Sequence, residues 1–206
     1  MPNCLRKVSL TFGKPLRRCL RPSPMSEHRD IVIAALTPAA RVCAFGVLYC
    51  FFVIGHDRRR ILHVNVTKHP TSGWIIQQLR EAFPFEAVHK YLIFDRDQKF
   101  RFEVIAAVKA TRIVPKRTSF RTPWQNGIAE RWVGSCRRDL LDHMVALNER
   151  HLKRLLSEYV CYHHEDRTHL GLEKGTPDGR IRSTARGQVL SQLRLGGLHH
   201  RYHRAA

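Results

Sequence analysis

The chain has 206 residues with 43% hydrophobic and 26% charged residues, the composition of a folded globular protein rather than a disordered one. Its 36 Lys and Arg against 17 Asp and Glu give a formal net charge of +19. This excess favours a polyanionic partner, with nucleic acid ahead of an anionic membrane or a ribosome-like assembly. The longest uncharged apolar stretch, residues 42–55, is shorter than the roughly 20 residues of a membrane-spanning helix.

The six cysteines, at positions 4, 19, 43, 50, 136 and 161, contain no Cys-x-x-Cys pair. This spacing provides neither a zinc knuckle nor a disulfide framework, so reduced thiols are expected. The basic N-terminus lacks an apolar segment followed by a small-residue cleavage site. We therefore expect a cytoplasmic, nucleoid-associated protein with no membrane partner.

The first strong secondary-structure signal is an antiparallel hairpin. Residues 1–30 are basic, rich in proline and without periodicity, which indicates loop or disorder. Residues 46–54 are rich in aromatic and β-branched side chains, as in a buried strand. Residues 61–67 alternate apolar and polar side chains, which predicts a half-buried partner strand.

Alternating helices and short strands are expected after the hairpin. The apolar spacing predicts helices from about residue 70 to 83, over 102–110, after Pro123 and over 148–163. Residues 91–94 form a short apolar run typical of a central strand, and another strand is expected near 113–114. The order predicts an α/β fold, a mixed sheet flanked by helices.

Two carboxylates stand in settings suited to a shared site. Asp95 follows the apolar run 91–94 and is expected at the carboxyl end of a sheet strand, where α/β proteins bind ligands. Glu130 lies two positions from both Ile128 and Trp132, so on a helix it points away from their apolar stripe. Taken singly, each is more often a turn residue or a solvated side chain. Together they suggest a divalent-metal site.

The sequence motifs around these carboxylates resemble those of the integrase catalytic core of bacterial insertion-sequence transposases, which are related to retroviral integrases. Between Asp95 and Glu130 lie 34 residues, close to the spacing of this family. The resemblance covers roughly residues 46–206, and its most specific motif is the one that contains Glu130. The matching motifs are Asp95-x-x-x-x-Phe100, Pro123-Trp-Gln-Asn-Gly-x-x-Glu130-Arg131, His164-x-x-Arg167-Thr-His-Leu170 with Thr176-Pro177, and Gly196-Gly-Leu-His-His-Arg-Tyr202.

The resemblance implies an RNase H-like fold and DNA strand transfer, in which three carboxylates hold Mg²⁺ or Mn²⁺ ions. Asp95 and Glu130 would be catalytic metal ligands. The implied partners are the DNA of element ends and target, and further copies of the chain. Candidates for DNA contacts, with a solvated basic face or a helix cap as the competing explanation, are Lys116, Arg117, Arg121, Arg131 and Arg167.

The first of the family's three acidic ligands is missing. Counting back along the chain places that position near Leu36, where no carboxylate stands, and Asp30 and Asp57 are the nearest substitutes. We therefore predict a catalytically impaired copy, N-terminally truncated or frameshifted, so whether it is an enzyme stays open at this stage. The expected organisation is an irregular N-terminal segment over 1–45, an integrase-like core over 46–180 and a basic tail over 181–206.

Two other functions are compatible with these residues. A non-catalytic remnant would bind DNA with a steep salt dependence but would not cleave it. A basic component of a ribonucleoprotein would prefer structured RNA, and its two carboxylates would then be incidental.

Overall fold

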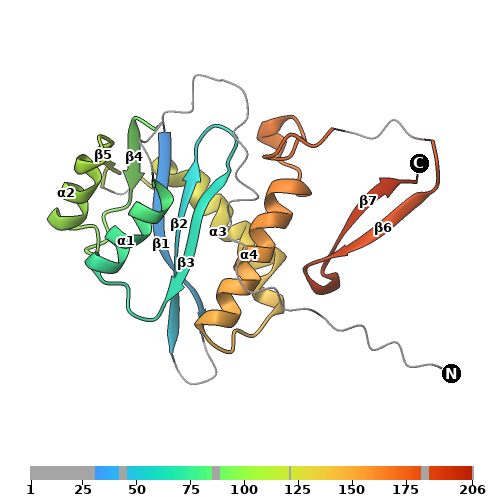
Figure 1. The fold of residues 1–206 in the computed structure, drawn as a ribbon, viewed down its shortest axis with the longest axis horizontal. Helices are drawn as coiled ribbons and strands as arrows, with labels where there is room; N and C mark the ends of the chain where they lie inside the picture. The colour runs from blue at the N-terminus through green and yellow to red at the C-terminus, as the bar shows by residue number, and fades with distance from the viewer. Residues whose placement is uncertain (1–30, 42–45, 85–88, 121, 182–185, 206) are drawn as a thin grey trace.

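A five-stranded mixed sheet with helices on both faces forms the body of the fold (Figure 1). The computed structural model describes residues 31–41, 46–84, 89–120, 122–181 and 186–205. The strands follow the order β3-β2-β1-β4-β5. Their bounds are β1 Ile31–Arg41, β2 Val47–Gly55, β3 Ile61–Thr67, β4 Tyr91–Phe94 and β5 Val114–Arg117.

The predicted hairpin and the mixed α/β sheet are confirmed. β2 pairs antiparallel with β3, with Phe52 opposite Val64. β4 pairs parallel with both β1 and β5, as strands joined by helical crossovers do. β2 is buried along its last six residues because both sheet faces are covered there.

The sheet begins before residue 46, the predicted domain start, because β1 is its middle strand. β1 pairs antiparallel with β2 and parallel with β4, so it cannot belong to an irregular segment. Its apolar run 31–36 has no alternation because residues on both of its faces are buried. Residues 1–30 and 42–45 lie outside the described residues, and so does the expectation for them.

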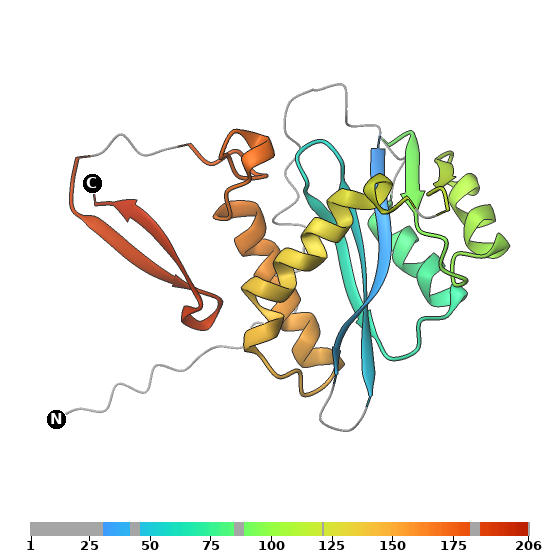
Figure 2. The same cartoon turned by 180° about the vertical axis from the view of Figure 1, so that it is seen from behind.

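Four helices cover the sheet in the places that their apolar spacing predicts. α1 (Ser72–Ala82) and α2 (Phe102–Ala110) pack on one face, and α3 (Gly127–Asp139) and α4 (Glu149–Glu165) on the other (Figure 2). Thr71 caps α1 by accepting a hydrogen bond from the Trp74 backbone N–H. Within the described ranges, no helix is long and apolar enough to cross a membrane.

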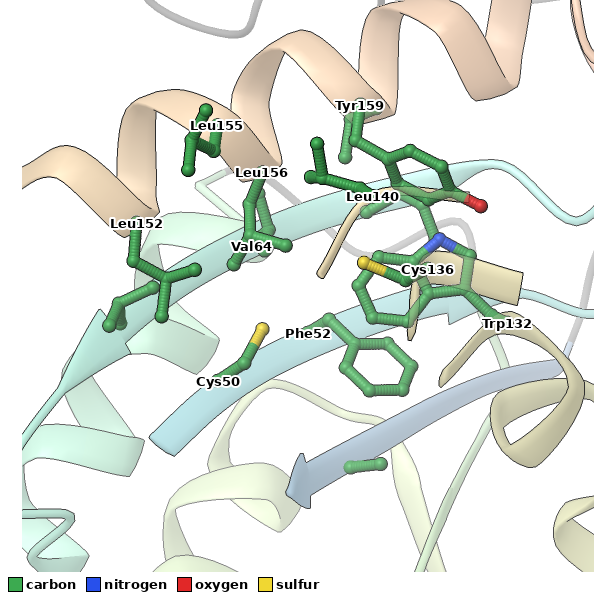
Figure 3. Close-up of a cluster of buried hydrophobic side chains, with 14 of the residues drawn as sticks. Cys50, Phe52, Val64, Trp132, Cys136, Leu140, Leu152, Leu155, Leu156 and Tyr159 are labelled. Atoms are coloured by element: carbon green, nitrogen blue, oxygen red, sulfur yellow. The ribbon is translucent and has the colours of Figure 1, made fainter. Parts of the chain in front are cut away.

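A dense apolar core fixes α3 and α4 against the sheet. The Trp132 ring of α3 lies 4.2 Å from the Phe52 ring of β2, tilted by 43°, and 6.4 Å from the Tyr159 ring of α4, measured between ring centroids (Figure 3). Burial raises the pKa of Cys50 to about 12, so this thiol behaves as an apolar core group. The position of α3 is therefore set by packing on the face opposite to Glu130.

The C-terminal segment, predicted as a basic tail, forms a hairpin. β6 (Val189–Arg194) and β7 (His199–Arg204) pair antiparallel around a turn at Gly196-Gly197. Most residues of both strands are exposed on both faces, so the sequence carries no clear alternation there. The hairpin is attached to the core by Arg194, whose Nε lies 2.7 Å from Asp166 Oδ2.

Candidate active site

Asp95 lies at the carboxyl end of β4, as the sequence predicts. It follows Phe94, the last residue of the parallel pairing with β1 and β5, and its side chain is exposed. Its Oδ1 accepts a hydrogen bond from the Arg96 backbone N–H at 2.6 Å. Asp97 turns away, because its Oδ1 accepts from the Lys99 backbone N–H instead.

Glu130 stands in the first turn of α3 and is exposed, whereas its neighbours Ala129 and Trp132 are buried. The 3.6-residue period of the helix separates these two directions. A carboxylate in a first turn is also stabilised by the positive end of the helix dipole. The predicted orientation of Glu130 is confirmed.

The two carboxylates line one cleft. Its volume is about 290 Å³, and its walls come from the end of β4, the loop after β5 and the start of α3. The predicted convergence of Asp95 and Glu130 over one site is therefore confirmed, and their catalytic role stays a prediction. The other lining residues are Arg96, Thr118, Ser119, Phe120, Thr122 and Asn126.

The loop after β5 is held by hydrogen bonds that the sequence alone does not reveal. The Thr118 backbone N–H donates to the Phe94 carbonyl at 3.1 Å, and Arg96 Nε donates to the Thr118 carbonyl at 2.9 Å. The Ser119 backbone N–H donates to Gln125 Oε1 at 2.7 Å. These bonds fasten the wall of the cleft to β4, next to Asp95.

The register of β1 places Ala35, rather than Leu36, beside Asp95. Ala34 pairs with Phe94, so Ala35 is the next residue along β1 and stands beside Asp95. Ala35 packs in the core that contains Ala129 and Trp132 of α3, whereas Leu36 packs against the core on the opposite face. A count along the chain cannot resolve a one-residue shift, which exchanges the two faces of a strand.

Asp57, the proposed substitute that the structure describes, does not occupy that position. Asp57 lies in the β2–β3 turn, near Ile31 at the start of β1, because Gly55 pairs with Val32. Ala35 lies four residues after Ile31 along the strand, about 13 Å away at the usual rise per residue. Asp30 lies outside the described residues. In the part of the chain that the structure describes, no group of three or more His, Cys, Asp or Glu could hold a metal ion.

The donor atoms around the cleft nevertheless suit a hard divalent cation. Asp95 and Glu130 supply carboxylate oxygens, and Asn126 lines the same cleft at 8% exposure. Asn126 Oδ1 is buried and has no hydrogen-bond partner among the described residues. An oxygen set of this kind fits Mg²⁺ or Mn²⁺ better than a softer metal, although it is one carboxylate short.

The five predicted DNA-binding residues occupy different environments. Lys116 and Arg131 are exposed, and Lys116 Nζ lies 5.9 Å from the centre of the Tyr91 ring. Arg117 donates to the Phe100 carbonyl, which engages one arm of its guanidinium. Arg121 lies outside the described residues. Their contact with DNA stays a prediction, and only Arg131 adjoins Glu130.

Arg167 is engaged inside the fold, which favours a structural role over contact with DNA. Its Nε donates to Asp139 Oδ2 at 2.7 Å and its Nη2 donates to Ser135 Oγ at 3.0 Å. Tyr159 Oη donates to the same Asp139 oxygen at 3.0 Å. The His199 ring also bonds to the Asp139 backbone carbonyl at 2.9 Å. Asp139 thus joins α3, α4 and the C-terminal hairpin.

Replacing Asp139 with asparagine should lower the free energy of unfolding by about 2–3 kcal/mol. The reason is that the hydrogen bonds that Asp139 accepts from the partly buried Arg167 and from the Tyr159 hydroxyl both weaken. Urea denaturation at pH 7.5 measures this. Asp142→Asn, at an exposed position close by, is the matched control and should change stability little. Equal stability of the two variants would show that the network contributes nothing.

Three buried histidines lie where the end of α4 meets the β2–β3 turn. His164 Nε2 accepts a hydrogen bond from the Ile61 backbone N–H at 2.8 Å, and the His163 ring bonds to the Arg59 carbonyl at 3.3 Å. The His163 and His169 rings meet edge to face, 4.6 Å apart. The sequence suggested a helix cap or DNA contacts for this segment, and burial favours the structural explanation.

The comparisons with known proteins agree with this architecture. Residues 111–177, which run from the end of α2 through the loop after α4, match the family model described as "Integrase core domain". This stretch contains Glu130 but not Asp95. No curated protein matches the sequence.

Solved structures of retroviral integrases have the same fold. The simian T-cell lymphotropic virus intasome, solved with PP2A regulatory subunit B56 gamma, has a chain that aligns with a TM-score of 0.59 at 12% identity, covering 86% of this chain and 67% of that one. The BIV integrase catalytic core aligns at 0.54 and 13% identity, covering 73% and 91%. The HTLV-2 integrase catalytic core, solved in complex with magnesium, aligns at 0.55 and 12%, covering 72% and 93%.

At these identities the likeness of the solved structures is a likeness of fold. It agrees with the family match, the strand order and the cleft between β4 and α3. The chain therefore has the RNase H-like fold of integrase catalytic cores, and residues 111–177 match the integrase core domain model.

Proposed function

We propose that this chain is a DNA-binding core of the strand-transfer class, with a divalent-metal site at Asp95 and Glu130 that is weakened by the loss of its third carboxylate. The observation that carries the proposal is the cleft that these two side chains share. The charge of +19 supports a DNA partner, since neutralising phosphates releases counterions. The DNA of element ends and target, in the nucleoid, is the proposed substrate.

The chemistry of the cleft follows from its oxygen donors. Asp95 and Glu130 would hold Mg²⁺ or Mn²⁺, with the amide oxygen of Asn126 as a further donor. When bound, such ions activate the attacking oxygen and stabilise the leaving oxygen in phosphoryl transfer. Arg96, whose Nε is fixed on the Thr118 carbonyl, places a positive charge at the rim, where a phosphate would enter. The relatives solved as dimeric and trimeric forms support a homo-oligomer.

Metal binding tests the proposal directly. We expect Mn²⁺ titration, followed by the electron paramagnetic resonance of the free ion, to show weak binding that Asp95→Asn or Glu130→Gln reduces about tenfold or more, because each removes a charged ligand. Asp97→Asn and Glu103→Gln, which remove carboxylates outside the cleft, are the matched controls. Mn²⁺ binding that is the same in all four variants would contradict a metal site at Asp95 and Glu130.

A non-catalytic DNA-binding protein is the second candidate, favoured specifically by Ala35 in place of a carboxylate. It predicts normal duplex binding without Mn²⁺-dependent nicking, and no effect of Asp95→Asn on either. A supercoiled plasmid assay with Mn²⁺ separates the two: residual nicking that disappears in Asp95→Asn supports the metal site. A preference for structured RNA over duplex DNA in the same binding assay would favour a ribonucleoprotein role instead.

A further inference from the structure

The β2–β3 turn carries three consecutive arginines, and two of them are fixed by the loop after α4. Arg58 Nε and Nη2 donate to the carbonyls of Pro177 and Thr176 at 2.7 and 2.9 Å. Arg60 Nη2 lies 3.2 Å from Asp178 Oδ1. These contacts hold the turn against the rest of the fold, so the residue between them has a defined position.

Arg59, the middle residue, points elsewhere and meets no carboxylate. Its backbone is in the left-handed region at φ 59°, and its carbonyl bonds to the His163 ring. Its guanidinium lies across Gly171, in space that a β-carbon at that position would occupy. Across the described part of the chain, the Arg59 side chain makes no ion pair or hydrogen bond.

Arg131 of α3 approaches Arg59 from the other side. The two arginines line the same small pocket, together with Ile128 and Ser135. Burial lowers the pKa of Arg59, and the positive charge of Arg131 lowers it further. Two like charges therefore lie close together, an arrangement that costs free energy unless an anion joins them.

The neighbouring carboxylates are paired with other arginines. Asp139 binds Arg167, and Asp178 binds Arg60. Asp166, whose side chain is 2% exposed, is shared by Arg180, Arg194 and Arg201. Within the described fold, neither Arg59 nor Arg131 forms an ion pair with a carboxylate.

The pair also lies next to the candidate active site, because Arg131 directly follows Glu130 on α3. A DNA strand that entered the cleft and followed the first turns of α3 would pass this pair. Guanidinium groups bind phosphate oxygens in pairs of parallel N–H···O bonds, which suits a site built from two arginines.

We propose that Arg59 and Arg131 form a clamp for backbone phosphates of the DNA strand that enters the Asp95–Glu130 cleft. This inference rests on the proposed DNA substrate, but it is independent of metal binding and catalysis. Arg59 is the new member: it joins the β2–β3 turn to the active-site helix through the bound DNA.

Salt dependence of duplex binding is the test, carried out with the full chain in EDTA so that metal plays no part. Each lost phosphate contact reduces the slope of log K against log salt by about 0.9. We expect Arg59→Gln and Arg131→Gln each to reduce it by about that amount, and the double variant by about twice as much. Glutamine keeps a β-carbon and a long side chain, so the left-handed backbone at position 59 is not penalised further.

The matched controls are Arg80→Gln on α1 and Lys109→Gln on α2, both exposed and on the opposite face of the sheet. They remove the same charge and should leave the slope unchanged. Slopes for Arg59→Gln and Arg131→Gln equal to those of the controls would overturn the clamp while leaving the metal site intact. If the unaltered chain binds duplex DNA no more tightly than it binds a neutral polymer, the proposed DNA function fails together with the clamp.

Discussion

Ala35→Asp is expected to strengthen Mn²⁺ binding at least about tenfold, because it adds a charged oxygen ligand beside Asp95. The position is argued from register: Ala34 pairs with Phe94, so residue 35 stands next to Asp95 on the face that packs against α3. Metal stabilisation of phosphoryl transfer amounts to several kcal/mol. We therefore expect Mn²⁺-dependent plasmid nicking to rise by about a hundredfold or more, at 1.36 kcal/mol per factor of ten.

The same substitution has an opposite effect when metal is absent. Ala35 is 8% exposed, so an aspartate there is buried close to a second carboxylate and should destabilise the fold by about 2–4 kcal/mol. Binding of an ion to the folded state restores stability by linkage, so Mn²⁺ should raise the melting temperature of Ala35→Asp more than that of the parent.

Leu36→Asp is the matched control, because it buries a carboxylate one residue away on the other face of the sheet. It should lose stability without any rescue by Mn²⁺. Adding Asp95→Asn to Ala35→Asp should also remove the rescue. A melting temperature of Ala35→Asp that does not respond to Mn²⁺ would show that residue 35 does not face the site.

The sequence was sufficient where one short segment determines the structure. Alternation of side chains predicted β3, and α4 begins at Glu149 because Asn148 caps it, as the apolar spacing beyond that residue indicated. Asp95 and Glu130 could be placed because a strand end and a helix face are both local properties. Their convergence could then be inferred from the order of the elements.

The sequence was insufficient where pairing partners are remote. The apolar run of β1 lies between Asp30 and a Pro-containing segment, and only its pairing with β2 and β4 shows that it is central. The role of Arg167 depends on Asp139, 28 positions away, and Arg59 meets Arg131 across 72 positions. No local pattern encodes these contacts, so the sequence offers a DNA contact for Arg167 and indicates no role for Arg59.

The buried histidines should make the fold sensitive to mild acid. Burial lowers the pKa of His164 to about 3 and that of His169 to about 4, with neighbouring arginines adding to the effect, and it lowers the pKa of His163 as well. In the unfolded chain each imidazole titrates near pH 6.5. As the pH falls below about 6.5, the unfolded state therefore binds protons that the folded state does not bind, and the free energy of unfolding decreases.

The expected size of this effect is comparable to the whole stability of a small domain. Each histidine contributes up to about 1.4 kcal/mol per pH unit, so the three together lower the free energy of unfolding by about 5 kcal/mol between pH 7 and pH 5. Domains of this size are stable by about 5–15 kcal/mol. Urea denaturation at half-unit steps of pH measures the slope, which should be steep below pH 6.5 and shallow above pH 7.

His164→Gln separates the titration from the packing, because a glutamine side chain can still accept the hydrogen bond of the Ile61 backbone N–H. It should reduce the slope of stability against pH by about a third, whatever it does to stability at pH 7. His203→Gln, at an exposed position of β7, should leave the slope unchanged. A parent slope below about 1 kcal/mol per pH unit between pH 6 and pH 5 would mean that these imidazoles are not held neutral in the fold.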